Sequence, residues 1–191
     1  MRRSREETAR TRARIVEKAA VLFREKGIEG VGLADLMQDA GLTHGGFYRH
    51  FASRDELVTE ACSLAFMESV QRMTGRAAAD PDNGLEKIVN AFLCESHVAN
   101  PGRGCGVAAL GGDVFRRDER TREAFTKGVT ALIDLLAALQ PGRTAVKRRE
   151  QAMVAYASML GALIMARGVD DPALRRSILE TVRRAILDRD H

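Results

Sequence analysis

The stretch "AGLTHGGFYRHFASRDEL", residues 40–57, decides the fold of this chain. It places a tight turn between two short amphipathic segments, and the second segment opens with the adjacent glycines Gly45 and Gly46. A glycine inside a helix costs roughly 0.8–1 kcal/mol relative to alanine. Two glycines in one turn therefore indicate that this turn must lie against another surface.

The ends of the segments carry helix-capping residues. Thr43 is a good N-cap for the segment that follows it, because its hydroxyl can accept a free backbone N–H of the first turn. Leu42 and Phe47 then occupy the two positions of a hydrophobic staple. Ser53 followed by Glu56 has the spacing of a capping box, so the next helix is predicted to begin there.

Helical periodicity dominates the whole chain, and no convincing alternating strand pattern is present. We predict an all-α fold of about nine helices. The predicted helices cover about 11–26, 33–40, a short segment from 44, 53–75, 85–93, part of 105–115, 119–139, 144–167, and a last helix that starts with Pro172 after the cap Asp171. Gly27 and Gly41 mark the ends of the first two.

Two domains are predicted from this order. Residues 1–55 form a three-helix helix-turn-helix domain, and residues 56–191 form a larger C-terminal helical bundle. Residues 1–14 contain six arginines and two glutamates, and so carry the whole formal excess of +4. This arginine-rich arm is either a solvated, disordered tail or an arm that contacts a polyanion.

Composition excludes several other classes of protein. No apolar run approaches the 18 residues of a membrane span, and the basic N-terminus lacks the apolar region of a secretory signal. The spacings of Cys62, Cys94 and Cys105 fit no common zinc pattern. We therefore expect reduced thiols in a cytoplasmic protein, with no metal, no cofactor and no membrane partner.

Residues 10–60 resemble the DNA-binding domain of the TetR family of bacterial transcriptional regulators. The resemblance rests on "RIVEKAAVLFREKGIEGVGLADLMQDAGLTHGGFYRHFASRDELV", residues 14–58, and is most specific in residues 40–57. The rest of the chain is similar to the family's C-terminal domain in length and helical pattern alone. The resemblance implies a regulator rather than an enzyme. It would most often be a repressor that a small-molecule effector releases from a near-palindromic double-stranded DNA operator.

The resemblance also implies which residues contact DNA. They are Thr43, His44, Gly45, Gly46, Tyr48, His50 and Arg54. His44 and Gly45 would approach base edges, and Tyr48 would lie against the DNA backbone and thymine methyl groups. His50 and Arg54 would contact phosphate. Gly45 lacks a Cβ and would let the helix come close to a base pair; the alternative is that the glycines allow close packing against the first helix.

This chain departs from the family where Ser or Thr is common. Val31, Gly32 and Gly46 stand at such positions, and the missing hydroxyls remove possible phosphate contacts. They leave open a third class of protein, a dimeric scaffold that no longer binds an operator.

For the C-terminal half, the resemblance implies a homodimer through the last two helices and a small-molecule pocket. Small residues support close approach between helices, although an ordinary intrachain core would use them equally: Ala152, Ala155, Gly161 and Ala162. Candidate pocket residues are Phe66, Met67, Phe92, His97, Cys105, Phe115, Phe125, Tyr156 and Met159. For each of them the alternative is plain core packing.

Cys105 supports two further hypotheses. It follows a glycine-rich stretch near a predicted helix N-terminus, with Arg103 close by, a setting that favours a reactive thiolate. It could therefore sense oxidants or electrophiles. Cys105 with His97 could also act as nucleophile and base in an enzyme, but no third orienting residue is evident.

Overall fold

The computed structural model describes residues 5–142 and 144–188, apart from the side chain of His44. Over these residues the fold is entirely helical, as predicted. Its α-helices are α1 (Arg5–Lys26), α2 (Leu33–Asp39), α3 (Arg54–Ala79), α4 (Gly84–Phe92), α5 (Glu95–Ala99), α6 (Gly106–Val114), α7 (Glu119–Leu139), α8 (Ala145–Gly168) and α9 (Pro172–Leu187). Three short 3₁₀ helices accompany them: η1 (His44–Arg49), η2 (Pro81–Asn83) and η3 (Pro101–Arg103). No helix of the described part is long and apolar enough to cross a membrane.

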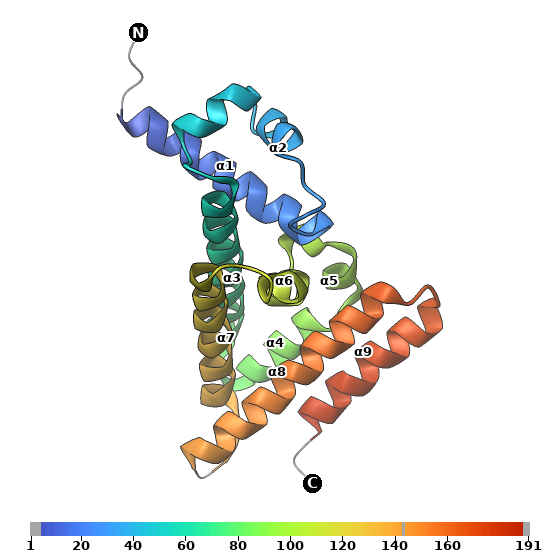
Figure 1. The fold of residues 1–191 in the computed structure, drawn as a ribbon. Coiled ribbons are helices and arrows are strands. Elements are labelled where there is room, and N and C mark those ends of the chain that lie inside the picture. Colours follow the sequence, from blue (N-terminus) through green and yellow to red (C-terminus); the bar gives the residue numbers. More distant parts are fainter. Residues whose placement is uncertain (1–4, 143, 189–191) are drawn as a thin grey trace.

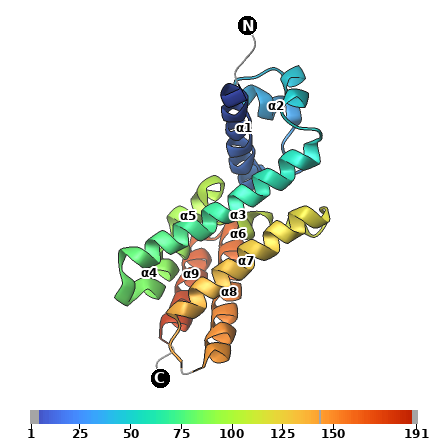
Figure 2. The same ribbon diagram turned by 90° about the vertical axis from the view of Figure 1, so that its left-hand side faces the viewer.

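The helices form two groups joined by α3. At one end α1, α2 and η1 lie together, and α3 runs from this group along the molecule beside α7 (Figures 1 and 2). At the other end α8 and α9 pack side by side as an antiparallel pair (Figure 1). The proposed domain boundary at 55/56 falls in the first turn of α3, so one continuous helix crosses it.

The N-terminal group has a core of its own because α1, α2 and η1 each bury one face. Its fully buried side chains include Ile15, Phe23, Leu36, Met37, Phe47 and Phe51. Gly27 and Gly41 end α1 and α2 with φ of 74° and 70°, a left-handed conformation that other residues adopt only with strain. Both helix ends were predicted from these glycines.

The helix starts confirm some capping predictions and correct others. Ser53 Oγ accepts the N–H of Glu56 at 3.1 Å, as predicted, but the Glu56 carboxylate accepts the N–H of Ala52 rather than that of Ser53. Thr43 holds the N-cap position of η1, yet its hydroxyl makes no capping bond. In a 3₁₀ helix the N–H of Gly46 pairs with the Thr43 carbonyl, at 2.9 Å, so this N–H is not available to the hydroxyl.

The first helix begins earlier than predicted, at Arg5 rather than near Thr11. Glu6 and Glu7 lie in its first turn, where carboxylates suit the helix dipole, and Glu6 pairs with Arg10 one turn on. The described part of the arginine-rich arm, residues 5–14, is therefore helix and not a tail. Arg2 and Arg3 lie outside the described residues.

Candidate nucleic-acid interface and ligand clefts

Two buried phenylalanines hold η1 against the core of the N-terminal group. Phe47 is fully buried, and its ring stacks on that of Phe51 with centroids 5.3 Å apart. The next residue, Tyr48, is 67% exposed and touches Phe47 only edge-on. The second element of the helix-turn-helix is thus fixed from inside and presents Tyr48 to solvent.

The paired glycines have no packing role within the described chain. A Cβ on Gly45 would meet nothing within 4 Å, and one on Gly46 would only reach ordinary contact with Thr43 and Met37 at 3.7 and 3.9 Å. A Cβ on either glycine would meet no described atom of α1 within 4 Å. Close packing against the first helix therefore does not explain them, and the space over Gly45 opens to solvent.

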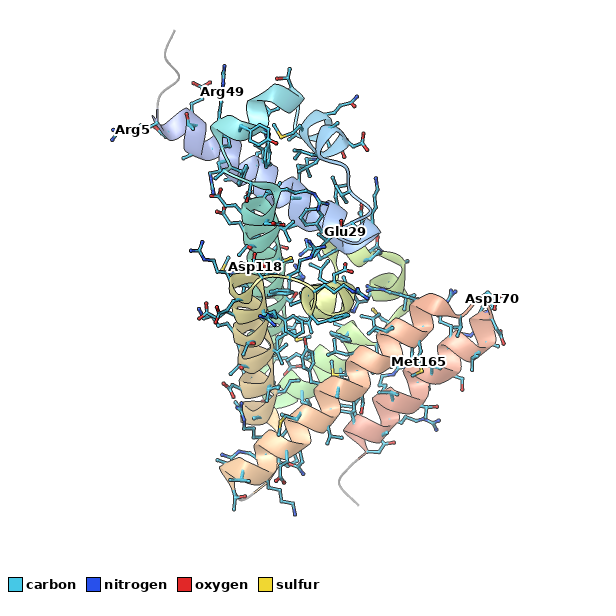
Figure 3. All side chains as sticks on the ribbon, in the orientation of Figure 1. Arg5, Glu29, Arg49, Asp118, Met165 and Asp170 are labelled. Carbon is cyan, nitrogen blue, oxygen red and sulfur yellow. The ribbon has the colours of Figure 1, made fainter. Side chains whose placement is uncertain are left out.

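A hollow beside η1 gathers several predicted DNA residues. Thr43, Gly46 and His50 line it together with Thr8 of α1 and Arg49. The sequence analysis missed Arg49, which is exposed and forms no ion pair within the described residues. Figure 3 shows Arg49 and Arg5 at the same end of the molecule. The signal that could have found it is its place directly after Tyr48.

Two arginines expected near DNA are engaged inside the protein instead. Arg54 donates to the carbonyls of Ile28 and Val31, at 2.7 and 3.2 Å, and so holds the loop between α1 and α2. Its contact with phosphate stays a prediction.

Arg12, from the predicted arm, clamps the far end of η1. It donates to the His50 carbonyl at 3.0 Å, pairs with Glu56 and Glu60 of α3, and lies over the Phe51 ring at 4.4 Å. Its guanidinium therefore links the C-terminal end of η1 to α3, and it is not available for a contact with DNA in this arrangement.

The positions that lack family hydroxyls take structural roles. Val31 is buried in the core, and Gly32 is the N-cap of α2, which consequently has no side-chain cap. A hydroxyl at either site is not needed for the observed packing.

The candidate pocket residues do not meet in one pocket. Phe92, His97 and Cys105 line a cleft of about 200 Å³ between α3, α4, α5 and η3, here called the arginine cleft. Phe66 and Met67 line an apolar cleft of about 450 Å³ between α3 and α7. Phe125 is not part of this lining, and its ring packs edge-on against that of Phe66. The remaining candidates line neither cleft: Tyr156 and Met159 are buried in the core, and Phe115 is exposed.

His97 connects two backbone segments. Its Nδ1 lies 2.8 Å from the Phe92 carbonyl, and its Nε2 accepts the N–H of Cys105 at 3.0 Å. This arrangement requires the neutral ring with the proton on Nδ1. Burial, together with the nearby charges of Arg167, Arg76 and Arg72, lowers the pKa of His97 to about 4, against the opposing effect of the bond to the Phe92 carbonyl. His97 is a half-buried histidine with both ring nitrogens bonded.

These bonds rule out the Cys/His pair proposed above. Both imidazole nitrogens of His97 are taken by backbone groups, so neither can accept the thiol proton of Cys105. The Cys105 Sγ instead lies 3.6 Å from the buried hydroxyl of Tyr156, whose pKa is raised by burial. Within the described residues no cluster of His, Cys, Asp or Glu is placed to hold a metal ion.

Comparison with known proteins agrees with this architecture. Residues 15–61 match the model of "Bacterial regulatory proteins, tetR family". The repressor NemR of Escherichia coli is 26% identical over 82% of this chain and 84% of its own length. The regulator TtgR of Pseudomonas putida is 43% identical over 58 residues, which cover 30% of this chain and 28% of TtgR.

Solved structures share the fold over almost the whole chain. A TetR regulator from Chloroflexus aurantiacus superposes with a TM-score of 0.78 at 23% identity, covering 96% of this chain and 95% of its own. Reduced NemR superposes with a TM-score of 0.76 at 23% identity, covering 93% and 95%.

The fold and the exposed recognition segment define a helix-turn-helix, DNA-binding transcriptional regulator. Residues 15–61 are a DNA-binding domain of the TetR family, and the chain has the fold of solved TetR regulators over 96% of its length. This is a family of regulators and not of enzymes.

Proposed function

We propose that this protein is a homodimeric repressor that a small molecule releases from a near-palindromic operator. The observation that carries the proposal is the braced η1 segment. Its inner face is held by Phe47 and Phe51, whereas Tyr48, Arg49 and the open side of Gly45 face outward. A segment held so firmly, with an unpacked polar and aromatic face, is suited to entering a major groove.

In this proposal the contacts with DNA divide by chemistry. His44 and Gly45 approach base edges, and Tyr48 lies on the sugar–phosphate backbone and thymine methyl groups. Thr43, His50 and Arg49 contact phosphates, which fix the register but carry no sequence information. Binding should therefore weaken as salt rises.

The proposed dimer uses α8 and α9. These helices expose large apolar side chains, among them Ile164, Met165 and Leu174, which a monomer would leave in water. Figure 3 labels Met165 on α8, beside the antiparallel α9. A two-fold axis through these helices would set two recognition segments roughly 34–36 Å apart, one turn of DNA.

Release is proposed to act through α3. This helix is capped at Ser53 next to η1, and farther along its length it lines both clefts. A ligand that prefers one tilt of α3 would change the spacing of the two recognition segments. Coupling of about 1–3 kcal/mol would change operator affinity some 5–150-fold.

The test is selection of binding sites from a random double-stranded DNA library, followed by shift assays at several salt concentrations. We expect enrichment of a two-fold symmetric sequence and steep salt dependence. Absence of enrichment, or equal binding to every sequence, would favour the dimeric scaffold and overturn the proposal.

Thiol-based sensing by Cys105 is a second candidate, favoured by one observation. Cys105 forms part of the wall of the arginine cleft and is 3% exposed, so its sulfur is within reach only of a small reagent that enters the cleft. The test compares operator binding before and after iodoacetamide in the parent, Cys105→Ser and Cys94→Ser. This candidate requires that only Cys105→Ser lose the response.

A further inference from the structure

The arginine cleft carries an unbalanced positive charge. Arg72, Arg76 and Arg103 line it, and no carboxylate does. Arg76 and Arg103 are exposed, and neither side chain forms an ion pair or a hydrogen bond within the described residues. Their guanidinium groups are therefore available to a ligand.

The carboxylate of Glu68 pairs with two arginines next to the cleft, Arg24 and Arg72. Glu68 lies 3.5 Å from the Arg72 guanidinium and 2.7 Å from that of Arg24, so it is shared between the two. Arg167 lies behind His97 and donates only to the carbonyls of His97 and Val98. The cleft and its surroundings thus hold more guanidinium groups than carboxylates.

The rest of the cleft is suited to an apolar body. Met73 and Phe92 are almost completely buried and form its apolar wall. His97 adds no charge, because both its nitrogens are bonded in the neutral form. Ser96 and Asn100 supply polar groups.

We propose that the arginine cleft binds a small organic anion. Its acidic group pairs with Arg76 and Arg103, and its flat apolar body lies against Met73 and Phe92. Guanidinium groups pair well with carboxylate, sulfonate and phosphate oxygens, because their N–H donors match the geometry of these groups. This deepens the proposed function by naming the chemical class of the effector, and it rests on that function only for the effect on DNA.

The cleft is also connected to the DNA-reading end. Arg72 donates to the Gly104 carbonyl at 2.6 Å, and Arg24 of α1 donates to the Gly102 carbonyl at 2.7 Å. Arg72 lines the same cleft, so the negative charge held by Arg76 and Arg103 would also attract Arg72 away from Glu68, the carboxylate that holds Arg24. The pair Arg24–Glu68 is thus the route by which the bound anion acts on α1.

The test uses two fluorescent probes that share one aromatic body. 8-Anilinonaphthalene-1-sulfonate carries a sulfonate, and N-phenyl-1-naphthylamine is the same molecule without it. Each is titrated into the parent and into the double variant Arg76→Gln/Arg103→Gln, which loses no intramolecular bond of the described structure. We expect the variant to weaken sulfonate binding by about tenfold or more, since hydrogen bonds to charged groups are worth roughly 1.5–3 kcal/mol.

Two sets of controls test where the sulfonate probe binds and whether its binding depends on charge. Lys127→Gln removes a cation from the apolar cleft and should leave sulfonate binding unchanged. The neutral probe should bind the parent and the double variant equally, and Arg76→Lys/Arg103→Lys should recover part of the sulfonate binding, because lysine restores the charge but not the guanidinium geometry. Circular dichroism checks that each variant is folded.

Unchanged sulfonate affinity in the double variant would overturn the proposal, as would a loss caused by Lys127→Gln. These titrations contain no DNA. A negative result in the titrations would contradict the anion site but not the proposed repressor function. A negative result in the DNA site selection would contradict the repressor function but not the anion site.

Discussion

The guanidinium of Arg24 in α1 lies 2.7 Å from the carboxylate of Glu68 in α3, and only 2% of the Arg24 side chain is exposed. The same guanidinium donates to the Gly102 carbonyl in η3. One buried cation therefore joins α1 of the N-terminal group, the long helix α3 and the wall of the arginine cleft. A buried cation is stable only while it is paired and hydrogen-bonded.

Removing the negative charge of Glu68 should therefore destabilise the fold. We expect Glu68→Gln to lower the free energy of unfolding by about 1–3 kcal/mol, measured by urea denaturation. The matched control is Glu6→Gln, which breaks the exposed pair with Arg10 and should cost less than about 1 kcal/mol. Equal losses in the two variants would show that Arg24 does not depend on Glu68.

Tyr48→Ala should reduce operator affinity without unfolding the protein. The side chain is 67% exposed, so its loss leaves the core intact and changes stability by less than about 0.5 kcal/mol. Shift assays measure the affinity. Val146→Ala, which truncates a similarly exposed residue of α8, is the control and should bind the operator as the parent does. Unaltered binding by Tyr48→Ala would mean that this face does not meet DNA.

Gly45→Ala should raise stability and lower operator affinity. A Cβ at this position meets nothing within 4 Å and φ is not positive, so alanine fits and stabilises by about 0.4–1 kcal/mol through the unfolded state. Against DNA the added methyl group would obstruct close approach. Gly75→Ala, in α3 with equally open space, should raise stability alone. Equal operator binding by both variants would contradict the proposed role of Gly45.

His97 should make the fold acid-sensitive. Its pKa is lowered from 6.5 to about 4, so between these values the unfolded chain binds a proton that the native protein does not. Stability contributed by the neutral ring is complete above about pH 6.5 and is lost as the pH falls towards 4, by roughly 2–4 kcal/mol.

Denaturation of the parent and of His97→Gln at about pH 7.5 and about pH 4.5 measures this effect. The parent should lose more stability than the variant between the two conditions, since all other titrating groups are common to both. Parallel losses would show that His97 is not held neutral.

Ile164→Glu should separate the proposed dimer. Ile164 is 55% exposed on α8, and a carboxylate buried there on association would oppose its like across the two-fold axis. Sedimentation velocity should show a monomer. Met67→Glu is the matched control, because Met67 is 52% exposed on α3 and lies outside the proposed interface. Dissociation of both variants, or of neither, would place the interface elsewhere.

The sequence by itself determined the helical class, the helix-turn-helix and several helix ends. These features are local: Gly27 and Gly41 stop helices through their own φ, and Ser53 caps the N–H three residues on. The four-residue spacing of Phe47 and Phe51 puts both rings on the buried side of η1, and Tyr48 faces outward. Family resemblance in residues 40–57 supplied the DNA-reading role.

Only the tertiary structure decided what the charged and polar residues contact. Arg12 reaches Glu56 and Glu60 across more than 40 positions of sequence, and Arg24 reaches Glu68 in the same way. His97 was recognisable as a histidine on an apolar face, but its partners lie on separate backbone segments. Such pairings depend on how α1, α3 and η3 pack, and the period of a single helix carries no information about the helix opposite. For the same reason the candidate pocket residues were divided among two clefts, the core and the exposed surface.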